Sequence, residues 1–171
     1  MTRRKLRQPD ELKAASEHVW YEFMMFAYVA QHPVDGASQG FVNLVVESFA
    51  VHLRNVLDFL YPGKVRSDWM IASDFVPKWN SVRPEITDRL KRAKRRVHKE
   101  IVHLSYDRNK VTKEAKPWDR VAIAQDIELA ADEFDKHLHD SLRSDDWQIP
   151  PFKAAISMIY FESGEAKFLN D

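Results

Sequence analysis

The sequence predicts an all-α protein: an up-and-down bundle of four long helices with short extra helical turns and an irregular C-terminal tail. Apolar residues recur at three- and four-residue steps through four long stretches, as in helices with one buried face. The stretches are joined by short connections, which favour neighbouring antiparallel helices. Only four glycines occur in 171 residues, too few for the closely spaced turns of an all-β fold. We expect one domain over residues 1–171, with its core at about 9–142 and the tail at 143–171.

Two long helices are predicted near the N-terminus. The first begins at Pro9 and Asp10, which are favoured at helix starts, and ends at Pro33. The second runs from about Ser38 to Tyr61 and stops at the turn sequence YPGK. It is apolar nearly all round, so we expect it at the centre with partners on more than one side. The core positions are Leu12, Ala15, Val19, Phe23, Phe26 and Ala30 in the first helix, and Phe41, Leu44, Val45, Phe49, Leu53, Val56, Leu57 and Leu60 in the second.

The pattern breaks up between residues 63 and 84, where short helical turns are predicted. Ser67 and Ser73 are candidate caps for these turns, because serine side chains accept hydrogen bonds from the first backbone N–H groups of a helix. Three large aromatic side chains are expected to anchor the segment to the core: Trp69, Phe75 and Trp79.

Two further long helices follow, the third beginning at Pro84 and the fourth running from about Asp119 to Leu142. Their core positions are Ile86, Leu90, Ala93, Val97, Ile101 and Leu104 in the third helix, and Val121, Ala124, Ile127, Ala131, Phe134, Leu138 and Leu142 in the fourth. Within the tail, the run FKAAISMIYFE fits a short helix, a strand or a segment packed on a neighbouring chain.

Composition excludes several classes of site. The chain has no cysteine, so disulfides, zinc ribbons and thiol nucleophiles are ruled out. It has no glycine-rich phosphate loop, Gly-x-Ser-x-Gly elbow or His-Glu-x-x-His motif, and we expect no cofactor and no metal. The longest apolar run is far shorter than a membrane span, so we expect a soluble, cytoplasmic protein without a membrane partner.

The third helix carries an unusual concentration of positive charge. Seven Lys or Arg residues and no acid occur from Arg89 to Lys99, although the whole chain has equal numbers of basic and acidic residues. At about 100° per residue, one stripe beside the apolar seam collects Arg89, Arg92, Arg96, Lys99 and His103. The stripe fits two partners: the phosphates of a nucleic acid, or the acidic side chains of the fourth helix, which are Asp126, Glu128, Asp132, Glu133 and Asp135.

Arg96 and His103 lie seven residues apart, so they project from one helix face about two turns apart. Such a pair suits phosphodiester chemistry. An imidazole can transfer a proton near neutral pH, and a guanidinium can hold a phosphate oxygen by two hydrogen bonds.

An arginine followed by six residues and a histidine, near the end of the third long helix of a bundle, resembles the motif of the HEPN superfamily of prokaryotic toxin and defence domains. The motif reads RVHKEIVH here, from Arg96 to His103. The segments HLRNVLDFLY, in the second helix, and HLSYDR, after the third, are similar to helix signatures of bacterial relatives of that superfamily. Val97 follows the arginine, where active members usually carry a polar residue. The resemblance covers about Pro9 to Leu142.

The resemblance implies a metal-independent endoribonuclease whose site forms where two protomers of a homodimer meet. His103 would act as general acid or base on the ribose hydroxyl, and Arg96 would stabilise the charged phosphate. Expected partners are RNA and an antitoxin or another protein. The alternative is a non-catalytic helical interaction module, whose basic stripe binds an acidic partner protein or its own fourth helix.

Two other groups of polar residues are candidate ion-pair, substrate-binding or metal sites. Arg54 and Asp58 lie one turn apart in the apolar second helix and fit a half-buried ion pair. Alternatively, Arg54 faces the groove of His103 together with Arg108 and contacts substrate. Glu100 and His103 have the Glu-x-x-His spacing of di-iron bundles, but the fourth helix has no second such pair, so no di-iron site is expected.

Overall fold

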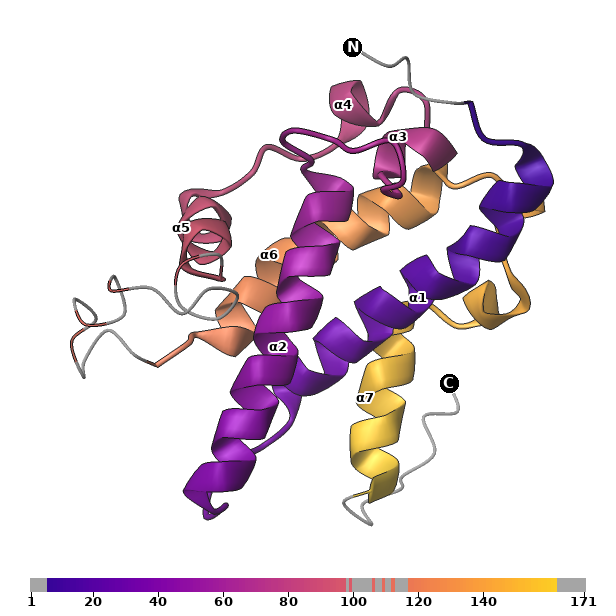
Figure 1. Cartoon of the computed structure of the whole chain (residues 1–171). Coiled ribbons are helices and arrows are strands. Elements are labelled where there is room, and N and C mark those ends of the chain that lie inside the picture. Colours follow the sequence, from indigo (N-terminus) through magenta and orange to yellow (C-terminus); the bar gives the residue numbers. More distant parts are fainter. Residues whose placement is uncertain are drawn as a thin grey trace.

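A computed structural model of the chain describes residues 6–97, 99, 106, 109, 112 and 117–162. These ranges are helical without any strand, which confirms the all-α class. At the centre, α1 (Pro9–Gln31) and α6 (Arg120–His137) lie side by side, and α2 (Gln39–Leu60) crosses them (Figure 1). The third long helix is described only as α5 (Asp88–Val97), which packs against α2 and α6. The structure therefore does not establish the up-and-down order of four long helices.

The first two helices begin where the sequence predicts. Before α1, the Gln8 backbone N–H donates to the Glu11 carboxylate at 2.9 Å. Before α2, the Ser38 hydroxyl accepts from the Phe41 N–H at 3.3 Å. Each bond satisfies a donor that the first turn of a helix leaves without an intrahelical partner.

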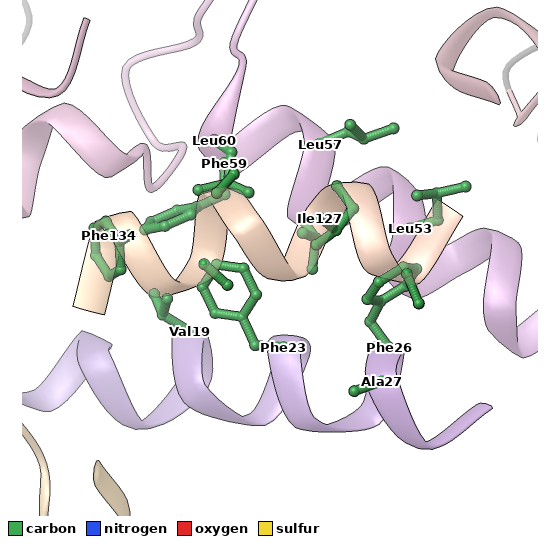
Figure 2. Close-up of a cluster of buried hydrophobic side chains, with 14 of the residues drawn as sticks. Val19, Phe23, Phe26, Ala27, Leu53, Leu57, Phe59, Leu60, Ile127 and Phe134 are labelled. Carbon is green, nitrogen blue, oxygen red and sulfur yellow. The ribbon is translucent and has the colours of Figure 1, made fainter. Parts of the chain in front are cut away.

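The hydrophobic core lies where α1, α2 and α6 meet. Figure 2 shows Phe23 and Phe26 of α1 pointing toward α6, with Phe59 and Leu60 of α2 on the other side. Phe26, Leu60, Ile127 and Phe134 are completely buried. The expected central position of α2 holds for its C-terminal half only. Its N-terminal turns extend beyond the core, and Phe41 and Leu44 are 42% and 65% exposed.

The segment between α2 and α5 contains two single-turn helices, α3 (Ala72–Phe75) and α4 (Trp79–Val82). The predicted serine caps are wrong, because Ser73 lies inside α3 and the Asp74 carboxylate accepts from the Ile71 N–H at 3.2 Å instead. Two of the predicted anchors, Phe75 and Trp79, are buried as expected, whereas Trp69 is half-buried.

Helix α6 begins where the sequence predicts, with Asp119 as its cap, but differs from the prediction at its C-terminal end and in the inward residue of its first turn. It stops at His137 instead of Leu142. The predicted core residue Val121 is 53% exposed. The preceding residue, Arg120, points inward and donates to the backbone oxygens of Val29 and His32 at the end of α1. The Arg120 guanidinium thus occupies the inward position in the first turn that the apolar spacing predicts for Val121.

The described part of the tail, residues 143–162, is mainly helical and not irregular. After η3 (Asp140–Leu142) come the 3-10 helix η4 (Asp145–Gln148) and then α7 (Pro151–Glu162), which packs on α1. Trp147, Phe152 and Ala155 are buried in the common core, so that core extends well past residue 142. The Trp147 indole N–H also donates to the Ser16 carbonyl of α1 at 3.0 Å.

Replacing Phe152 with alanine is expected to lower the free energy of unfolding by about 3–5 kcal/mol, because the ring is only 5% exposed and its loss leaves a cavity against α1. Met158→Ala on the same helix serves as the control, since that side chain is 40% exposed, and should cost under about 1 kcal/mol. Urea denaturation followed by circular dichroism measures both. Equal, small effects would show that α7 does not share the core.

Candidate functional site

The candidate site is built on α5, whose local structure follows from three buried side chains and one cap. The Thr87 hydroxyl accepts from the Leu90 N–H at 3.1 Å, so the helix starts at Asp88 instead of Pro84. Leu90, Ala93 and Val97 form its buried face. With these residues turned inward, the basic side chains must leave from the flanks and the outer face of the helix.

Lys94 leaves the flank toward α2. Its ammonium donates to the Tyr61 carbonyl at 2.8 Å and pairs with the Asp58 carboxylate, also at 2.8 Å. Helix α2 has no basic residue in its own last turn. Lys94 therefore supplies positive charge to the negative end of the α2 dipole, which makes it an architectural residue.

Arg89 leaves the opposite flank, toward α6. Its Nη1 donates to the Asp126 carboxylate at 3.0 Å and to the Ala122 carbonyl at 3.1 Å. The Thr87 hydroxyl donates to the second oxygen of Asp126 at 2.7 Å. Of the two partners considered for the basic stripe, the fourth helix is thus the partner of Arg89.

Arg96 is held by the segment just before α6. Its Nη1 donates to the Pro117 carbonyl at 3.0 Å, and the guanidinium carbon lies 4.0 Å from the centre of the Trp118 ring. The ring itself meets Phe49 of α2 edge-on at 5.7 Å. Stacking on an anchored indole fixes the plane of the guanidinium.

The other half of the predicted catalytic pair, His103, lies outside the described residues, as do Arg108 and Glu100. The pairing of Arg96 with His103 therefore stays a prediction. Lys99 is described and exposed.

The outer face of α5 carries Arg92 and Arg95, both exposed. Neither side chain has a hydrogen-bond or ion-pair partner within the described part of the chain. The acid of this helix, Asp88, pairs with Lys91 at 3.1 Å. Arg92 and Arg95 are three residues apart in α5, so they are neighbours on one face with like charge.

The other acids of α6 are engaged away from α5. Glu133 pairs with Lys136 at 3.5 Å and His137 at 2.8 Å, and Asp135 pairs with Arg143. Of the remaining two, Asp132 lies near Lys153 of α7, and Glu128 lies near Asp132.

The pKa of the Asp132 carboxyl is raised above its ordinary 3.8 by partial desolvation and by the nearby charge of Asp135, and Lys153 of α7 opposes the rise. Desolvation and the charge of Asp132 raise the pKa of Glu128 as well. In both carboxyls the folded chain therefore favours the protonated form more than water does.

Arg54 forms the predicted pair with Asp58, with its Nε 3.7 Å from a carboxylate oxygen. Both residues line a cavity of about 390 Å³ between α1, α2 and the segment before α3. The sequence does not predict this cavity. Polar residues interrupt two otherwise apolar helices here: His18 and Glu22 on α1, and Arg54 on α2. Only the crossing of the helices brings these polar residues together.

Compared with family models, curated proteins and solved structures, the chain shows no significant match in any of the three. Among the helices of the described ranges, none combines the length and apolar character needed to cross a membrane.

Two substitutions on α6 are expected to change stability in opposite directions at pH 7. A raised carboxyl pKa means that the folded protein binds the proton more tightly, so Asp132 opposes folding once the pH exceeds about 3.8. Asp132→Asn should therefore raise the free energy of unfolding at pH 7, by under about 1 kcal/mol because the group is exposed. The gain should vanish below about pH 3.8.

Asp126→Asn is the matched comparison, since Asp126 accepts from Arg89 and Thr87. It should lower the free energy of unfolding at pH 7 by about 1–2 kcal/mol. Urea denaturation of the three proteins from pH 3.5 to 7.5 measures the effects. A stability loss in Asp132→Asn at pH 7 would contradict the raised pKa of Asp132.

Proposed function

We propose that the chain is a HEPN-like helical domain of prokaryotic toxin or defence type that acts on RNA as a homodimer. The observation that carries the proposal is the outer face of α5, where Arg92 and Arg95 are exposed and have no acidic partner within the described residues. Like charges one helical turn apart destabilise a helix. The phosphates of RNA would relieve that repulsion and release counterions on binding. We therefore assign the backbone contacts to Arg92, Arg95 and Lys99.

In this proposal Arg96 and His103 carry the chemistry. His103 takes the proton of a ribose 2′-hydroxyl as that oxygen attacks the adjacent phosphorus, and Arg96 stabilises the negative charge that develops on the phosphate oxygens. The bond from phosphorus to the 5′-oxygen of the next nucleotide breaks, that oxygen takes a proton from water, and a 2′,3′-cyclic phosphate is left. The stacking of Arg96 on Trp118 supports the assignment, because a guanidinium held in one plane loses little freedom when it binds phosphate. The exposed Phe41, Leu44 and Val51 of α2 give an apolar surface that association of two protomers could bury.

The second candidate is a non-catalytic helical interaction module that binds an acidic protein, such as an antitoxin, through α5. The inward contacts of the basic stripe favour it. Arg89 is tied to Asp126 and Ala122, and Arg96 is tied to Pro117. In this alternative those arginines stabilise the fold, and the outer face binds carboxylates instead of phosphates.

Cleavage of labelled single-stranded RNA in the presence of EDTA separates the two candidates. The wild-type protein should cleave, and His103→Ala should reduce the rate at least about 100-fold, because proton transfer by a positioned side chain contributes that much. Arg96→Gln should reduce it to a similar degree. His137→Ala is the control, since this exposed histidine pairs with Glu133 on α6, and its rate should stay within about twofold of wild type.

Circular dichroism establishes that each variant is folded, and light scattering of the assayed protein should give the mass of a dimer. A folded wild-type protein that cleaves none of the RNAs, or a His103→Ala variant as active as wild type, would leave the interaction module as the function.

RNA binding by the outer face of α5 has its own test, made in the His103→Ala background so that RNA is not consumed. Adding Arg92→Gln and Arg95→Gln should weaken binding and reduce the slope of log affinity against log salt by about 1.4, since each lost phosphate contact on a single strand contributes about 0.7. Lys13→Gln, an exposed cation of α1, should change neither quantity. Fluorescence anisotropy from 50 to 300 mM salt measures them. An unchanged slope in the double variant would exclude this face as the phosphate contact.

A further inference from the structure

The cavity between α1 and α2 has an apolar floor. Val19 and Phe23 of α1 and Val56 and Phe59 of α2 line it, and all four belong to the buried side chains of the protein. Its volume of about 390 Å³ is in the range of small-molecule sites, which combine a mainly apolar lining with a few polar groups that orient the ligand.

The opening is lined by polar side chains whose charges are unequally compensated. Glu22 is already engaged, because its carboxylate lies 2.8 Å from the His52 ring nitrogen. Asp58 is engaged more strongly by Lys94, at 2.8 Å, than by Arg54, at 3.7 Å. Two cations therefore share one carboxylate at this corner. Arg54 is 35% exposed, and no other partner contacts its guanidinium within the part of the chain that the structure describes.

The wall facing this corner comes from the segment before α3. Trp69 is half-buried and Met70 is 44% exposed, and both line the cavity. An indole and a thioether are suited to contact a flat ring. The cavity thus offers an apolar floor, a flat wall and an under-compensated guanidinium at the rim.

We propose that this cavity is a binding site for a small organic anion with a flat apolar ring, such as an aromatic carboxylate. The ring lies on the floor beside Trp69, and the anionic group accepts hydrogen bonds from the Arg54 guanidinium. Asp58 remains paired with Lys94 when Arg54 turns to the ligand, so this carboxylate keeps a cation. The proposal does not depend on RNA cleavage, since it uses neither Arg96 nor His103.

Three naphthalene probes of equal ring size test the proposal: 2-naphthoate, 2-naphthylmethanol and 2-naphthylmethylammonium. Binding to the full chain is measured by isothermal titration calorimetry and by ligand-observed NMR. The wild-type protein should bind 2-naphthoate at least about tenfold more tightly than the neutral alcohol, because a charge-assisted hydrogen bond is added to the same ring burial. The ammonium compound should bind most weakly.

Arg54→Gln should remove the preference for 2-naphthoate and leave the affinity for 2-naphthylmethanol unchanged. Trp69→Ala should weaken both probes by a similar factor, since it alters the wall and not the charge. Arg92→Gln is the matched control for the loss of one positive charge and should alter neither probe. Equal affinities of the three probes for the wild-type protein, no binding of any of them, or a naphthoate preference that survives in Arg54→Gln would each overturn the proposal.

Discussion

One buried phenylalanine of α6 connects that helix to five other elements of the fold. Phe134 of α6 is completely buried and meets aromatic rings from α1, α2, α3, α4 and η4. Their centroids lie 5.1–6.2 Å from that of Phe134, and the rings belong to Phe23, Phe59, Phe75, Trp79 and Trp147. Single-turn helices such as α3 and α4 are not stable by their own hydrogen bonds. Contact with this ring fixes them, and with them the preceding segment that lines the cavity.

The ends of the central helices place a second constraint on the fold, and basic side chains satisfy it. Neither α1 nor α2 has a basic residue in its last turn. Arg120 reaches the last carbonyls of α1, and Lys94 reaches the Tyr61 carbonyl beyond α2. Trp79 and Arg83 both donate to the Leu60 carbonyl, at 2.7 and 3.1 Å. A helix end enclosed by other elements needs such donors, because water cannot reach its free carbonyls. Some of the positive charge therefore belongs to the architecture.

This explains which parts of the fold could be predicted from the sequence. Start and stop residues place the ends of α1 and α2 within one or two residues, and the spacing of apolar residues identifies the buried face of α1 and of the C-terminal half of α2. The spacing of apolar residues predicts that Val121 of α6 is buried and Arg120 is not, because it treats arginine as outward-facing. It takes no account of a carbonyl acceptor on another helix. In the tail, FKAAISMIYFE has no clear polar face. Only docking of Phe152 on α1 decides that it is a helix, and that contact spans most of the chain.

The candidate site, like the fold, could be predicted from the sequence only in part. The positive charge of α5 is evident from the sequence. The separate roles of its basic residues are not, because those roles depend on acceptors of α2 and α6. Lys94 and Arg89 face fixed acceptors and stabilise the packing of the helix. Arg92 and Arg95 gain no such contact within the described residues and repel each other across one turn. The proposed RNA contact rests on this exposed pair, because a polyanion lying along the helix face would neutralise both guanidinium groups together.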